Sequence, residues 1–161
     1  MDTSSDTSSE DKPTLETAVL AVGGRDEERV ADLVDTVKEV VTDNSQVIVV
    51  HVFDTESYTE TVENIANKGG EYVDPDKLAA QMSVIQAIIG LFEENAINYD
   101  VRATTENKGD GIVEIATESD ADRVIIGGRQ RSPTGKALFG SMAQNVLLNA
   151  PCPVTFVRDA K

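Results

Sequence analysis

A stretch without acidic residues covers positions 127–158 of a chain in which Asp and Glu make up 29 of 161 residues. It follows the apolar run Val124–Ile126, leads into a helical segment at Ser141 and holds four of the eleven glycines. It also carries Arg129, Arg131 and Lys136, and it ends at Arg158. A strand, a glycine-rich basic loop and a helix start together favour a phosphate group, because free N–H groups and the helix dipole attract anions. The stretch therefore predicts an anion-binding site.

A second glycine turn, Gly23-Gly24-Arg25, follows the first apolar run of the chain. Ligands of open parallel sheets bind outside the carboxyl ends of the strands, where the strand order reverses. If the strands before residues 23 and 127 are neighbours, both turns should line one crevice, with Gly140 and Ser141 adding helix N-terminal donors. The alternative is purely structural: Gly127 and Gly128 only end a strand, and Ser141 only caps its helix.

The apolar pattern indicates alternating strands and helices. Runs rich in β-branched residues predict strands at 18–22, 47–53, 99–103, 124–126 and 154–157. Helical periodicity predicts helices over 26–42, around 78–92, after an N-cap at Asp110, and over 141–149 with a Ser141–Gln144 capping box. Such strands need cover on both faces, so the fold class expected is α/β, a single doubly wound parallel sheet with helices on both faces. The polar segment 54–74 is expected to be a solvated loop, a short helix or a lid.

Length and charge limit the function classes. The chain suits one α/β domain over residues 14–161, preceded by a disordered acidic Ser/Thr-rich tail over 1–13. That tail lacks the basic start and apolar run of a signal peptide, and no apolar run is long enough to span a membrane, so we expect a cytoplasmic protein. The net charge of −15 argues against nucleic acid and anionic membranes as partners. Both a halophilic origin and an ordinary acidic protein fit this composition.

Little in the sequence points to catalysis or to a metal. His51, the single histidine, lies in an apolar run and is expected to be packed or hydrogen-bonded, and the single Cys152 cannot form an internal disulfide. Without His or Cys companions no metal site is expected. Gly135-Lys136 is not a Walker loop, because Gln130 and Ala137 stand where that motif has glycine and a hydroxyl. No Ser/His/Asp set follows from spacing, so we expect no enzyme.

The spacing of Gly127, Gln130, Gly140 and Ser141 resembles the G-x2-G-x9-G-[ST] motif shared by nucleotide-binding members of the universal stress protein family. The ending 149–154, with Pro151 and Pro153, is similar to the turn by which that family enters its last strand. The resemblance implies a five-stranded parallel sheet in the order 3-2-1-4-5 and a homodimer through Val154–Val157. In one branch of the family it also implies ATP held by the two turns.

The resemblance implies a specific set of nucleotide- or phosphate-binding residues, and this chain departs from the family at three positions. Gly23 stands where ATP-binding members have an Asp for adenosine, Gln130 replaces the second glycine of the motif, and Ala143 lacks a hydroxyl. Losses of this kind cost about 1–3 kcal/mol each, enough to move micromolar binding towards millimolar. The residues implied are Gly23, Gly24, Val52, Ile126, Gly127, Arg129, Gln130, Gly140, Ser141 and Met142.

The sequence thus predicts a non-catalytic stress-response protein that binds a nucleotide, ATP or AMP, or another anion in a degenerate site. Mg²⁺ is expected only as a companion of the nucleotide. A ligand-free homodimeric interaction module of the same fold is the alternative from another class. Slow ATP hydrolysis is a third hypothesis, for which the sequence shows no base.

Overall fold

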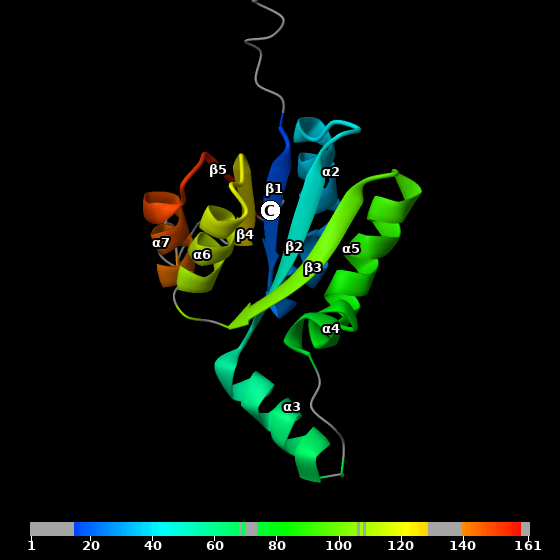
Figure 1. The fold of residues 1–161 in the computed structure, drawn as a ribbon, viewed down its shortest axis with the longest axis vertical. Helices are drawn as coiled ribbons and strands as arrows, with labels where there is room; N and C mark the ends of the chain where they lie inside the picture. Colours follow the sequence, from blue (N-terminus) through cyan, green and yellow to red (C-terminus); the bar gives the residue numbers. More distant parts are fainter. Residues whose placement is uncertain are drawn as a thin grey trace, which may run out of the picture.

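The computed structural model describes residues 15–67, 69, 74–105, 107, 109–128 and 140–158, so the expected tail over 1–13 lies outside it. It contains one five-stranded sheet in the order β3-β2-β1-β4-β5, with every pair parallel (Figure 1). This confirms the predicted fold class and strand order. The strands are β1 (Thr17–Val22), β2 (Gln46–Phe53), β3 (Asn98–Thr105), β4 (Arg123–Gly128) and β5 (Val154–Arg158).

Helices cover both faces of the sheet (Figure 1). We call them the α2/α5 face, covered by α2 (Val30–Val40) and α5 (Ser83–Glu94), and the α6/α7 face, covered by α6 (Asp110–Glu118) and α7 (Ser141–Asn149). Because successive strand residues point to opposite faces, β1 sends Leu20 and Val22 into the α2/α5 core, and Val19 and Ala21 into the α6/α7 core. Five of the six residues of β1 are buried, as a strand covered on both sides requires.

Two of the predicted helices are interrupted. The segment 26–42 begins with a 3₁₀ helix, η1 (Gly24–Arg29), and only then becomes α2. Asp26 causes the tighter first turn, because its N–H donates to the Gly23 carbonyl at 3.0 Å while its side chain holds the Gly23 N–H. The segment around 78–92 splits into α4 (Pro75–Ala80) and α5, because Met82 between them has an extended backbone.

Of the alternatives left open for 54–74, the structure shows a helix, α3 (Thr55–Asn67). It starts at the carboxyl end of β2 and extends away from the rest of the molecule (Figure 1). Its first turns are held by Tyr58, whose ring centroid lies 5.1 Å from that of Phe53. Within the described residues, no helix combines the length and the apolar content that a membrane span needs.

Helix α4 closes the β3 edge of the sheet. The Asp76 carboxylate accepts the backbone N–H of Ala103 at 2.8 Å, and its other oxygen lies 3.8 Å from the guanidinium Nε of Arg102. Asp76 therefore satisfies a donor that an edge strand would otherwise present to water or to another chain.

Replacing Asp76 with alanine should lower the free energy of unfolding by about 1–2 kcal/mol, because the half-buried Ala103 N–H loses a charged acceptor. The exposed Arg102 pair adds little to this loss. Urea unfolding monitored by circular dichroism would measure the change. Asp76→Asn is the matched control, since its amide oxygen can still accept from Ala103. Equal stabilities of the alanine and asparagine variants would contradict the assignment.

Candidate functional site

The turn after β1 is built around a buried carboxylate. Gly23 continues the strand with an extended backbone (φ −114°, ψ 176°), and its N–H donates to Asp26 Oδ2 at 2.8 Å. The other oxygen, Asp26 Oδ1, pairs with Nη1 of Arg29. Asp26 and Arg29 are each only 6% exposed, so the two opposite charges neutralise one another inside the protein.

The Asp26–Arg29 pair packs directly against Gly127 at the end of β4. A Cβ at Gly127 would lie 2.8 Å from Arg29 Cδ and 3.0 Å from Asp26 Oδ1, which is closer than such atoms approach. Glycine is therefore required here by close contact. β1 and β4 are hydrogen-bonded neighbours, as the prediction of a shared crevice required. The loop that follows Gly128 lies outside the described residues, so the crevice itself stays a prediction.

Helix α7 starts without a side-chain cap. Gly140 is its N-cap (φ −64°, ψ 165°), and no atom of the described residues lies within 4 Å of the place where its Cβ would stand. The predicted Ser141–Gln144 capping box is therefore wrong: Ser141 is already inside the helix, and the backbone N–H of Gln144 donates to the Gly140 carbonyl at 3.0 Å. A Ser one position too late cannot reach the first-turn amides. The positive end of α7 consequently begins with no N-cap side chain to occupy it.

The N-cap expected at Asp110 is also wrong, because Gly109 takes that position with φ +88°. A Cβ at Gly109 would lie 2.8 Å from the Met142 carbonyl oxygen, so both conformation and contact require glycine. Asp110 instead accepts a hydrogen bond at 2.7 Å from the amide of Asn145. These contacts fix the start of α6 against α7.

The predicted site residues fall into three groups. Val52 and Ile126 belong to the α6/α7 core, and Met142 packs against it. Gly23 lies beside this group, since a Cβ there would be 3.9 Å from the Val52 carbonyl oxygen. Gly24 is exposed in η1 and Gly127 points to the opposite face, while Arg129 and Gln130 lie outside the described residues.

Sequence reasoning missed Asp26 and Arg29 as part of this region. A usable signal was present, because an acidic residue three positions after an N-cap often bonds back to the N-cap N–H. Five of the six residues in the segment 24–29 are charged, which favours an exposed segment. Two of these five, Asp26 and Arg29, are nevertheless buried.

Comparison with known proteins decides the family. The family model described as the universal stress protein family matches residues 7–158. The chain belongs to the universal stress protein family. A universal stress protein of Mycolicibacterium smegmatis is 31% identical over 94 residues, which cover 58% of this chain and 71% of that relative.

Two solved structures extend the comparison to the whole fold. A universal stress protein of Archaeoglobus fulgidus shares 25% identity with a TM-score of 0.58, over 88% of this chain and 98% of that chain. A universal stress protein crystallised in complex with cAMP shares 20% identity with a TM-score of 0.56, over 91% of this chain and 98% of its own. At 20% identity the cAMP complex shows a shared fold only, and its cAMP is a ligand of that protein.

In this universal stress protein the histidine is a packed residue, as predicted. His51 is 3% exposed, its ring meets Phe53 edge-on at 4.6 Å, and its Nδ1 has no hydrogen-bond partner in the described part of the chain. Burial lowers its pKa to about 4, because the charged ring would lose its hydration. His51 lies two residues after Val49 in β2, so it points to the same α2/α5 face, away from α7.

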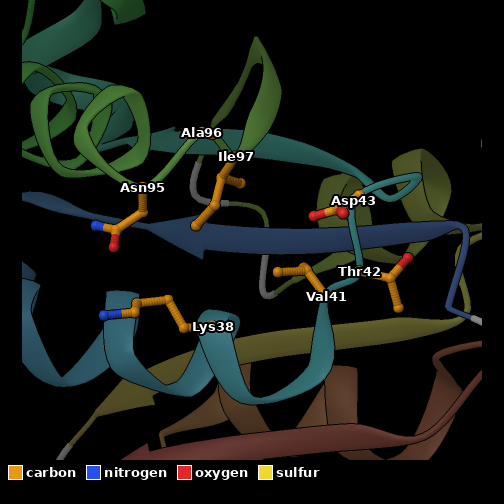
Figure 2. Close-up of a pocket in the computed structure, with 7 residues that line it drawn as sticks. All are labelled: Lys38, Val41, Thr42, Asp43, Asn95, Ala96 and Ile97. Carbon is orange, nitrogen blue, oxygen red and sulfur yellow. The ribbon is translucent and has the colours of Figure 1, made fainter.

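A pocket of about 220 Å³ lies at the other end of the strands, where α2 and α5 end and before β2 and β3 begin (Figure 2). Its walls carry one lysine and one aspartate among small and apolar side chains, and it is open to solvent. Among the described residues no group of His, Cys, Asp and Glu could hold a metal ion. The pocket is lined by Lys38, Val41, Thr42, Asp43, Asn95, Ala96 and Ile97.

The buried histidine predicts an acid-sensitive fold. The unfolded chain protonates His51 near its ordinary pKa of 6.5, whereas the folded chain does so only near 4. Stability is therefore lost as the pH falls through this window, by about 2 kcal/mol between pH 7.5 and pH 5. Chemical unfolding at both values would measure it. His51→Gln serves as the control, because it cannot titrate, and a variant with the same pH dependence as the parent chain would contradict this account.

Proposed function

We propose that this universal stress protein is a non-catalytic stress-response protein that binds the phosphate of an adenine nucleotide, ATP or AMP, between the ends of β1 and β4 and the start of α7. The observation that carries the proposal is the uncapped N-terminus of α7 at Gly140. It lies on the same face as Val52 and Ile126, next to the point where the strand order reverses. A helix of nine residues whose N-cap glycine brings no side chain to its positive end suits a phosphate group.

Charge and family support the same ligand. The sequence from 127 to 158 contains no acid, and Arg129, Arg131 and Lys136 lie within it between β4 and α7. These residues are outside the described part of the chain, so only their charge and place in the sequence enter the argument. A member of the same fold was crystallised with cAMP. Mg²⁺ would come with the nucleotide, since no described cluster holds a metal.

The described residues around the site also favour binding over catalysis. His51 is buried, neutral at physiological pH and on the far face of the sheet. The Asp26 carboxylate has both oxygens engaged, by the Gly23 N–H and by Arg29. Neither group can serve as a general base for a ligand at α7, because a base must come within hydrogen-bond reach of the proton it removes.

The proposal predicts that Gly140→Asp folds normally but loses nucleotide. Space and backbone at Gly140 accept a side chain, and Asp is a favourable N-cap, so the melting temperature should stay equal or rise slightly. The new carboxylate would occupy the first amides of α7 and repel phosphate, so ATP affinity should fall by about tenfold or more. Isothermal titration calorimetry with ATP and AMP, at low and at molar KCl, measures this.

Gly140→Asn is the control for that experiment, because it caps the helix without adding charge and should weaken ATP binding less. An unchanged ATP affinity in Gly140→Asp would refute a phosphate site at α7. A folded parent protein that gives no heat at millimolar ATP and AMP would favour the ligand-free module instead.

We further propose a homodimer through the β5 edge, over Val154–Val157. The N–H of Val124 donates to the Pro153 carbonyl at 3.0 Å, so in a parallel ladder residues 153 and 155 face β4 and the N–H of Val154 points away from it. Half-buried apolar side chains along this outer strand support the proposal, because such an edge seeks a partner.

Val154→Pro should give monomers, because it removes an outward N–H while leaving the bonds to β4 in place. Light scattering after size-exclusion chromatography measures the mass. Val154→Thr keeps the N–H and should remain dimeric. A dimeric Val154→Pro variant would exclude this interface.

A further inference from the structure

Gly23 leaves an empty position on the α6/α7 face. Val22 points into the α2/α5 core, so the next residue, with an extended backbone, points the other way. Among the described residues, the atom nearest to a Cβ built there is the Val52 carbonyl oxygen, at an ordinary contact distance of 3.9 Å. Neither backbone conformation nor packing requires glycine at this position. The space it leaves opens beside the nucleotide site proposed above, and its nearest polar atom is an uncharged main-chain oxygen.

The closest carboxylate along the chain, Asp26, does not reach this space. It lies against Gly127 and Leu33 on the α2/α5 face, and the sheet separates it from α7. Both of its oxygens are also engaged, with the Gly23 N–H and with Arg29. Releasing them would leave a buried cation without its counter-charge, which is costly.

The other described carboxylates that follow a carboxyl strand end or begin the neighbouring helix are also engaged locally. Asp54, after β2, accepts the backbone N–H of Glu56 at 3.0 Å. Asp110, at the start of α6, accepts the amide of Asn145 at 2.7 Å. The loop between β4 and α7 cannot supply a carboxylate, because the sequence has no Asp or Glu from 127 to 158. Glu106, after β3, lies outside the described residues and is tested separately below.

We propose that this site does not read the ribose 2′-hydroxyl, so that it binds 2′-deoxyadenosine nucleotides as well as adenosine nucleotides. In the dinucleotide-binding folds built on open α/β sheets, a carboxylate near the crevice recognises that hydroxyl. Here the position beside Val52 that could hold such a group carries no side chain, and the carboxylates nearby are engaged elsewhere. A neutral carbonyl accounts for a few-fold preference at most. The site would then recognise the nucleotide through its phosphate groups and its adenine base. This inference rests on the proposed function.

The test compares ATP with 2′-deoxy-ATP on the full chain by isothermal titration calorimetry. Dissociation constants within about threefold of each other support the proposal. A preference for ATP above about tenfold overturns it while leaving the proposed nucleotide function intact. Failure of both nucleotides to bind folded protein at millimolar concentration overturns the proposed function, and this inference with it.

Variants at two positions locate the effect. Gly23→Asp places a carboxylate at this position and should create a preference of about tenfold for ATP over 2′-deoxy-ATP. Gly23→Ala adds a Cβ without an acceptor and should create none. A Gly23→Asp variant that binds both nucleotides equally would overturn the placement of the ribose beside Val52. The parent chain could instead prefer ATP over 2′-deoxy-ATP and lose this preference in Glu106→Gln. That result would assign recognition of the 2′-hydroxyl to Glu106 and overturn the proposal.

Discussion

The buried Asp26 carboxylate is the contact on which the rest of this region depends. It holds the Gly23 N–H, neutralises Arg29 and packs against Gly127, so a single side chain joins the turn after β1 to the end of β4. Removing one partner of a buried ion pair typically costs about 3–5 kcal/mol, because the other charge remains without compensation. The constraint is also steric. A Cβ at Gly127 would lie 2.8 Å from Arg29 Cδ, so any larger residue there would have to displace the buried ion pair.

The two faces of the sheet have separate roles. The α2/α5 face is filled by large apolar side chains such as Phe92, Ile85 and Leu33, and it also contains the ion pair and the neutral His51. The α6/α7 face ends instead in Gly23 and in the glycine-capped start of α7. The buried ion pair therefore lies on the side opposite to the one we propose for the ligand. Changes at the ligand side can alter binding without disturbing the buried pair.

Sequence patterns were sufficient for the sheet, because β-branched apolar runs report burial on both faces, and the strand order came with the family resemblance. They failed where tertiary contact overrides local preference. Asp110 and Ser141 look like better N-caps than glycine, yet Gly109 alone tolerates φ +88° against the Met142 carbonyl, and Gly140 starts α7. The sequence predicted only part of the candidate site. Its glycines have a recognisable spacing, whereas Asp26 stands in a charged segment, so its burial becomes evident only from the fold.

The closed β3 edge has a consequence for assembly. Because α4 and Asp76 occupy that side, two copies that meet through their outermost fifth strands would form one continuous ten-stranded sheet with both ends blocked. A third copy would then have to pair with β3, where α4 lies and Asp76 already holds the Ala103 N–H. A chain with two open sides could instead extend into a fibre. In a dimer of this kind, a helix of six residues would limit further growth.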